Sequence, residues 1–178
     1  MKNIEETIKS KFIDMLSTRR IDEIDVQTLA KELKITRQTF YYHFKNIYDL
    51  VSSIILDQKL DVKEGENLEE IINNVLDEYY DNDEFYKEIL DSSAKDILEE
   101  YTYSYFYRAL ILYLKEDKRL GLDSRKDIAS FISYGISNNL LTHFKYDNYT
   151  KEDVKNKIQA FLNVQNIKSL VEGYLNNI

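Results

Sequence analysis

The sequence of 178 residues contains no cysteine, no proline and no tryptophan, and it contains only four glycines. Without cysteine the chain can form no disulfide, no thiol nucleophile and no cysteine-ligated zinc site. The lack of proline removes the strongest helix breaker, so long helices are expected. With so few glycines, neither a P-loop nor a glycine-rich dinucleotide fingerprint can be written.

Histidine is also scarce, since only His43 and His143 occur. They form no His-x-x-x-His pair, and the sequence contains no Gly-x-Ser-x-Gly elbow. Carboxylates are abundant, but abundance on solvated helices needs no catalytic explanation. The sequence therefore predicts a protein that is not an enzyme and that carries no cofactor and no metal.

Long apolar runs are missing too. The longest, Tyr103 to Leu114, is interrupted by Ser104 and Arg108 and is far shorter than the roughly 20 residues that span a bilayer. The stretch from Met1 to Ser17 mixes charged and apolar residues and lacks the apolar core of a signal sequence. We expect a cytoplasmic protein with no membrane partner.

Apolar residues recur with helical spacing along the whole chain, and no alternating strand pattern is visible. The fold class expected is all-α with about nine helices: an N-terminal three-helix domain with a helix-turn-helix over residues 1–46, and a helical bundle over 47–178. Asp61 to Glu66, which contains Gly65, is the expected linker. The helices after the first three are expected within residues 46–60, from 67 onward, and within 83–90, 94–117, 124–144, 150–162 and 167–178.

The most specific segment runs from Val26 to Phe44 and predicts two short helices joined by a tight turn. Apolar residues at positions 26, 29, 30 and 33 give the first helix one buried face. Asp25 and Thr36 stand where helix N-caps are wanted, and residues 34–35 are left to form the turn.

The second helix directs outward a set of side chains suited to DNA. Amide and guanidinium groups can read base edges in a major groove, while tyrosine, threonine and lysine can contact phosphates. The set is Arg37, Gln38, Thr39, Tyr41, Tyr42 and Lys45. The alternative is that this is simply the polar face of an amphipathic helix.

Residues 24–50, IDVQTLAKELKITRQTFYYHFKNIYDL, resemble the DNA-binding domain of the TetR/AcrR family of bacterial transcriptional regulators. The matching positions are Thr36, Thr39, Phe40, Tyr41, Phe44, Lys45 and Asn46. The resemblance implies a homodimeric repressor that binds a near-palindromic double-stranded DNA operator under the control of a small-molecule effector. It places the DNA contacts at Gln27, Thr28, Arg37, Gln38, Thr39, Tyr41, Tyr42, His43 and Lys45.

Two positions depart from the family pattern. Ile47 stands where a phosphate-binding lysine is usual, so one backbone contact is expected to be weaker. Lys34 stands where glycine is usual, so a residue with a Cβ has to adopt a left-handed conformation.

The aromatic helix from Ala94 onward is the expected centre of the second domain. By the same resemblance, this region encloses an effector, and the residues expected to contact it are Tyr101, Tyr105, Arg108 and Tyr113. Arg108 would anchor an anionic group. The alternative is that the tyrosines fill the core while Arg108 pairs with a nearby acid.

The helices expected near 124–144 and 150–162 combine small and apolar residues. The resemblance places the dimer interface here, at Ile128, Phe131, Ile132, Gly135, Ile136, Leu140, Val154, Ile158 and Phe161. Residues 131–144, FISYGISNNLLTHF, also resemble regulators of dihydroxyacetone kinase operons. The alternative is a helical hairpin packed within one chain.

Charge is unevenly divided. Residues 1–50 carry nine Lys/Arg and eight Asp/Glu, whereas residues 51–178 carry fifteen and twenty-four. An acidic protein binds DNA poorly outside a dedicated surface, because phosphate affinity comes from cations. This acidity and Ile47 leave one alternative function open, a non-enzymatic protein-interaction adaptor or co-regulator on the same fold.

Overall fold

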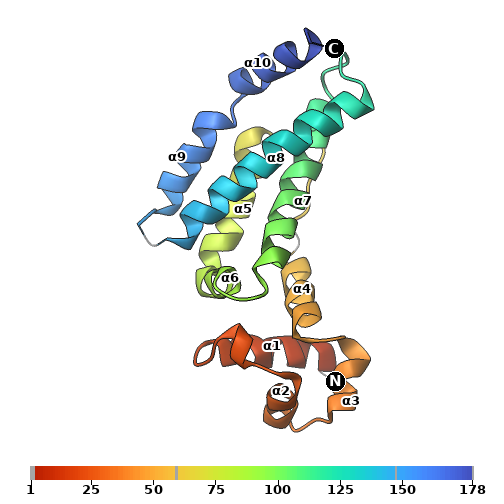
Figure 1. Ribbon diagram of the computed structural model, residues 1–178, viewed down its shortest axis with the longest axis vertical. Coiled ribbons are helices and arrows are strands. Elements are labelled where there is room, and N and C mark those ends of the chain that lie inside the picture. The colour runs from red at the N-terminus through yellow and green to blue at the C-terminus, as the bar shows by residue number, and fades with distance from the viewer. Residues whose placement is uncertain (1–2, 59, 147, 178) are drawn as a thin grey trace. The chain divides into compact units, whose positions relative to one another are not determined.

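A computed structural model describes residues 3–58, 60–146 and 148–177, and within them the chain is entirely helical. This confirms the expected all-α class, with ten α-helices and one short 3-10 turn in the described residues (Figure 1). In chain order they are α1 Ile4–Leu16, η1 Ile21–Glu23, α2 Val26–Leu33, α3 Arg37–His43, α4 Ile47–Asp57, α5 Leu68–Asp81, α6 Asp83–Leu90, α7 Lys95–Leu114, α8 Leu122–Lys145, α9 Lys151–Phe161 and α10 Val164–Leu175.

Side-chain caps explain where several helices begin. The Asn46 carboxamide accepts a hydrogen bond from the Asp49 amide at 2.9 Å and opens α4. Before α5, Asn67 and Glu70 cap each other's backbone amides at 2.9 and 3.0 Å, the reciprocal arrangement that their spacing predicts. The end of α4 differs from the expectation of about residue 60, because the helix stops at Asp57.

The described residues form two compact units. Unit 1 comprises Met1–Lys59 and Asn82–Leu98, and unit 2 comprises Leu60–Asp81 and Glu99–Ile178. The helix α6 therefore belongs with the N-terminal helices, although α5 before it and α7 from Glu99 onward belong to unit 2. The division into domains of residues 1–46 and 47–178 stays a prediction.

Unit 1 is built around α1. This helix packs against α2 and α6, and α2 packs in turn against α3. Apolar residues at helical spacing turn one face of each helix inward, which is the pattern that drives such packing. Fully buried members of this core are Ile8, Phe12, Leu29, Phe40 and Leu50.

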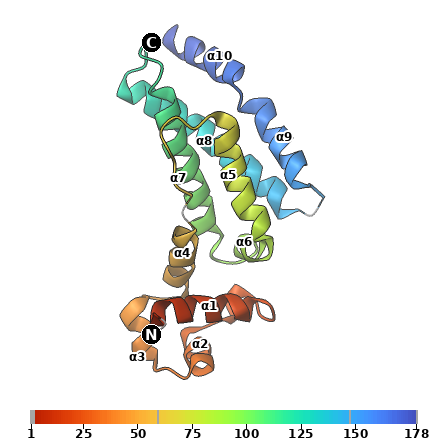
Figure 2. The ribbon, with the colours of Figure 1, turned by 180° about the vertical axis from the view of Figure 1, so that it is seen from behind.

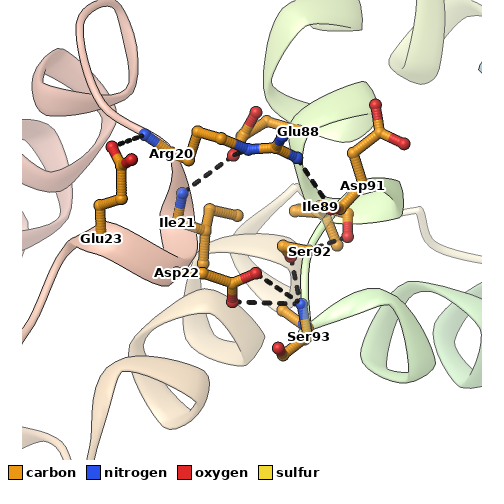
Figure 3. Close-up of polar contacts among 10 residues, drawn as sticks. Arg20, Ile21, Asp22, Glu23, Glu88, Ile89, Asp91, Ser92 and Ser93 are labelled. Atoms are coloured by element: carbon orange, nitrogen blue, oxygen red, sulfur yellow. Dashed lines mark hydrogen bonds and ion pairs between the residues drawn. The ribbon is translucent and has the colours of Figure 1, made fainter.

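A set of polar contacts, which we call the η1–α6 clamp, joins the turn before α2 to the end of α6 (Figure 3). The Glu88 carboxylate accepts a hydrogen bond from the Ile21 amide at 2.9 Å. In the opposite direction, the Asp22 carboxylate accepts from the Ser93 amide at 3.2 Å. The Arg20 guanidinium donates to the backbone carbonyl of residue 91, at 2.9 Å, where a cation suits the negative end of α6.

Unit 2 is a bundle of α5, α7, α8, α9 and α10. The helix α9 packs against both α5 and α8 (Figure 2). Two lysines of α9 form ion pairs with acids of α5, Lys155 with Glu69 at 3.0 Å and Lys151 with Asp77. Between α7 and α8, the hydroxyls of Tyr103 and Ser130 lie 3.1 Å apart. None of the helices in the described ranges combines the length and the apolar character needed to cross a bilayer.

Candidate nucleic-acid interface

The turn between α2 and α3 has the geometry that the sequence predicts. Lys34 adopts a left-handed conformation with φ 56° and ψ 38°, and no other non-glycine residue in the described ranges has a positive φ. The amide of Ile35 donates to the Ala30 carbonyl at 3.0 Å, and the amide of Lys34 donates to the Lys31 carbonyl at 3.1 Å. This pair of bonds is a Schellman motif, which ends α2 and turns the chain toward α3.

Both helices of the motif begin at the predicted caps. The Asp25 carboxylate accepts a hydrogen bond from the Thr28 amide at 2.6 Å, and this bond lowers the pKa of Asp25. The Thr36 hydroxyl accepts from the Thr39 amide at 3.1 Å and lies 2.9 Å from the Thr39 hydroxyl. The caps therefore fix the first turn of α3, where Arg37 and Gln38 are located.

One side of α3 is buried and holds the helix in place. Phe40 and Phe44 are 0 % and 3 % exposed, and their ring centroids are 5.7 Å apart. The ring of Tyr41 meets the Phe40 ring edge-on, at a centroid distance of 5.7 Å. The aromatic anchors leave α3 little freedom to rotate about its own axis, so the side chains on its other face point in a fixed direction.

The other side of α3 is exposed and carries the predicted DNA-reading groups. Tyr42 is 86 % exposed and Tyr41 is 56 % exposed, and Arg37, Gln38 and Lys45 are exposed as well. A large tyrosine left mostly in water on a seven-residue helix buries little apolar area within its own chain, so it is available to another molecule.

The remaining residues of the predicted set lie at the margins of this face. Gln27 is exposed and Thr28 is half-buried in the first turn of α2. Thr39 and His43 are half-buried on α3, and the His43 ring packs edge-on against the Tyr42 ring at 5.1 Å. All nine predicted contact residues thus lie in the first turn of α2, on α3 or directly after α3.

The local charge of the motif suits an anion. Residues 26–45 contain four Lys/Arg and a single acid, Glu32, although the whole chain has a formal net charge of −8. A cationic surface on an acidic protein confines phosphate attraction to that surface. Ile47 is 8 % exposed at the start of α4, so it contributes to the core and not to this charge.

The four residues predicted to contact an effector all lie on α7 but differ in their surroundings. Tyr105 is fully buried and donates its hydroxyl to the Ile71 carbonyl at 3.0 Å, and burial raises the pKa of Tyr105 to about 12. Arg108 is exposed and donates to the Ser104 carbonyl of its own helix at 3.2 Å. Tyr101 and Tyr113 are half-buried. A common ligand for these four residues stays a prediction.

Unit 2 also contains a large hollow that none of these four residues lines. It has a volume of about 790 Å³ and is lined by residues of α7, α8, α9 and α10. Three aromatic side chains on its walls are strongly exposed, namely Phe131 and Tyr134 at 74 % each and Phe161 at 70 %. A hollow with such exposed walls is an open groove, and we call it the α8–α9 groove.

The residues predicted for the dimer interface divide between this groove and the core. Those that line the groove are Phe131, Ile132, Gly135, Ile136, Ile158 and Phe161. Ile128, Leu140 and Val154 are at most 2 % exposed and belong to the core of unit 2. Their part in an interface stays a prediction.

Sequence reasoning missed two residues of the α8–α9 groove and one long-range ion pair. Tyr134 lies one turn after Phe131 and lines the groove, and the i, i+3 spacing of two aromatics was the available signal. Leu170 of α10 also lines the groove, but nothing in the sequence relates it to α8. The ion pair of Lys9 with Asp57 joins positions 48 residues apart, which no local pattern reveals.

Comparisons with known proteins agree with this architecture. Residues 66–164 match the TetR-type family described as "Transcriptional regulator C-terminal region". No curated protein matches the chain significantly. Among solved structures, the dihydroxyacetone kinase operon activator DhaS is similar over 94 % of this chain and 96 % of its own, with a TM-score of 0.66 and 17 % sequence identity. At that identity the likeness concerns the fold alone.

The family match spans more than half of the chain and runs from the residues before α5 into the start of α10, so it is independent of the helix-turn-helix in unit 1. The fold similarity extends over both units. The chain is a transcriptional regulator of the TetR family.

Proposed function

We propose that this regulator binds a near-palindromic DNA operator as a homodimer and represses the adjacent genes until a small molecule releases it. The α3 helix would lie in the major groove, and the nine residues of the predicted set would contact bases and phosphates. Operator binding would place its action in the compartment that holds bacterial DNA, the cytoplasm.

One observation carries the DNA-binding part of the proposal, the exposure of the outer face of α3 above a fully buried aromatic anchor. A single helix fits a major groove, and an amide such as that of Gln38 can bond adenine with two hydrogen bonds. Arg37 can bond guanine or phosphate, and the Tyr42 hydroxyl can donate to a phosphate oxygen. The caps at Asp25 and Thr36 supply the preorganisation that such contacts need.

The α8–α9 groove supports the homodimer. Exposed apolar area of this kind marks an interaction surface, and a two-fold axis lets Phe131 and Phe161 of each copy enter the groove of the other. Gly135 leaves open space on the groove wall, since an added Cβ there would meet no atom within 4 Å. Asn139 lines the same groove, and its buried Oδ1 has no hydrogen-bond partner among the described residues. Two α3 helices about 34–36 Å apart would then read two half-sites.

We propose repression because it is the usual action of regulators in this family. The structurally similar DhaS, however, is an operon activator. An effector changes DNA affinity only if it binds the two dimer shapes unequally. A reporter gene placed behind the selected operator gives the sign directly, because deletion of the regulator raises expression for a repressor and lowers it for an activator.

Selection from random duplex DNA tests the proposal. We expect enrichment of a two-fold symmetric site, with affinity that falls steeply as salt rises. Gln38→Ala is expected to weaken specific binding by about tenfold or more, because a bidentate base contact is worth about 1–3 kcal/mol. Tyr42→Phe removes one hydroxyl and is expected to weaken binding to all sequences alike.

The matched control is Gln165→Ala, which removes an exposed amide of α10 and should leave DNA binding unchanged. If the wild-type protein enriches no site at low salt, operator binding is refuted. Capture of a protein partner under the same conditions would then favour the adaptor or co-regulator function.

A further inference from the structure

A buried lysine in the middle of α1, Lys9, lies close to both ends of the segment from Phe44 to Asp57, which follows α3 and contains α4. Lys9 is only 6 % exposed. Its ammonium donates to the Asp57 carboxylate at 2.6 Å and lies 2.8 Å from the Glu5 carboxylate. It also lies 6.0 Å from the centroid of the Phe44 ring. Lys9 therefore contacts the last residue of α4 and faces Phe44, the residue that directly follows α3.

Asp57 is poorly placed for helix stability. It is the final residue of α4, where the helix dipole is negative and a carboxylate is disfavoured, and the last turn contains no basic residue. Glu5, by contrast, lies in the first turn of α1, where a carboxylate is favourable. The unfavourable position of Asp57 is compensated by Lys9 from another helix. An acid at the unfavourable end of a helix, neutralised by a lysine from another helix, suggests that the contact between the two helices serves a purpose other than the stability of α4 itself.

The charge state of Lys9 is secure at neutral pH. Burial alone lowers the pKa of Lys9, but hydrogen bonds to Asp57 and Glu5 together raise it above its ordinary value of 10.5. Glu6 is a third acid close by, at 3.8 Å. The ammonium is thus held between carboxylates of α1 and α4, and without it these acids would repel one another.

The two ends of α4 are held in different ways. Its beginning is fixed by the Asn46 cap and by the buried Ile47, directly after α3. Its last turn is held by the buried Ile54 and Ile55, and beside it a hollow of about 300 Å³ is lined by residues of α1 and α4 that include Lys9, Ile13 and Asp57. The contact between Lys9 and Asp57 is therefore a charged, directional restraint that acts together with this apolar packing against a swing of the α4 end away from α1.

We infer that Lys9 is a positioning residue that fixes the direction in which α4 leaves α1 and, in the homodimer, the separation of the two recognition helices. The second part rests on the proposed function. Because α4 is the covalent connection between α3 and the residues from 60 onward, a change in its direction reorients α3 in each copy. The predicted result is a relaxed preference for the spacing between half-sites, with base preference within each half-site unchanged.

Spin labels test the first part without DNA or an effector. The chain has no cysteine, so Lys31→Cys on α2 and Leu56→Cys near the end of α4, both exposed, give two unique labelling sites. Labelled protein is diluted with unlabelled protein so that distances within one copy dominate. We expect one narrow distance distribution, which broadens in Lys9→Met and in Asp57→Asn and narrows again in Lys9→Arg.

The matched control is Lys11→Met, which removes a lysine of the same helix whose ion pair with Glu32 of α2, at 3.7 Å, does not involve α4. Its distribution should equal that of the wild type. If Lys9→Met also leaves the distribution unchanged while circular dichroism reports a folded protein, the positioning role is overturned.

Selection from random DNA tests the second part. The preference of Lys9→Met for the best half-site spacing over a spacing one base pair longer is expected to fall by about tenfold, typical of the coupling between contacting residues. A broadened distance distribution with an unchanged spacing preference would overturn the link to the recognition helices. If the wild-type protein selects no symmetric site, the proposed function fails, and the spin-label distances still decide whether Lys9 positions α4.

Discussion

Replacement of Lys34 by glycine should stabilise the protein. The residue has φ 56° and ψ 38°, a left-handed conformation in which the Cβ of an L-residue lies too close to the following carbonyl oxygen. That conformation costs roughly 1–2 kcal/mol for a non-glycine residue and nothing comparable for glycine. The two hydrogen bonds of the Schellman motif use backbone atoms only, so Lys34→Gly retains them.

The gain is partly offset in the unfolded state. Glycine loses more conformational freedom on folding than other residues, which costs about 0.4–1 kcal/mol. The net expectation is that Lys34→Gly is more stable than Lys34→Ala by about 0.5–1 kcal/mol. The comparison with alanine matters because both variants lose the same positive charge, whereas only glycine loses the Cβ.

Urea unfolding followed by circular dichroism measures this difference, and thermal unfolding should show a shift of about 1–4 °C for a chain of this size. Lys34→Asn should fall between the two variants, since asparagine tolerates the left-handed region better than alanine. If Lys34→Ala is as stable as Lys34→Gly, the backbone at this turn is not strained and the reasoning is refuted.

Three further perturbations follow from the structure. Asp25→Ala should lower the free energy of unfolding in urea by about 1 kcal/mol, because the α2 cap is lost. Asp25→Ser should keep most of the wild-type stability, because serine is also a good N-cap. Phe131→Glu should convert a dimer to a monomer in sedimentation velocity, at little cost to the unfolding midpoint, because the side chain is 74 % exposed. Hydrogen bonds from Arg119 lower the pKa of Asp117 from 3.8 to about 2, so the stability it provides at neutral pH is lost as the pH falls from about 4 to 2. Thermal midpoints over that range should show a smaller decline in Asp117→Asn than in the wild type.

Local features of the fold were predictable from the sequence because their causes lie within a few residues. The caps at Asp25, Thr36 and Asn46, and the reciprocal pair of Asn67 and Glu70, join groups three residues apart. The exposed face of α3 follows from the same helical periodicity that buries Phe40.

Features that depend on distant pairings were not predictable. In the η1–α6 clamp, the hydrogen bond from the Ile21 amide to the Glu88 carboxylate joins residues 67 positions apart, and the ion pair of Lys9 with Asp57 joins residues 48 positions apart. Many acids along the chain could have served either partner equally well. Arg108 illustrates the same limit, since its exposed position on α7 depends on which face of that helix the rest of the bundle covers, and α7 is apolar on almost every side.

The assignment of α6 to unit 1 has a consequence for how the protein is made. A nascent chain that has exposed only its first 59 residues lacks the Glu88 acceptor for the Ile21 amide and lacks the helix that packs on α1. Tyr86 and Ile89, which become fully buried, are synthesised only after all of α5. Unit 1 therefore cannot be completed in order from the N-terminus, and its last native contacts form only when more than half of the polypeptide has left the ribosome.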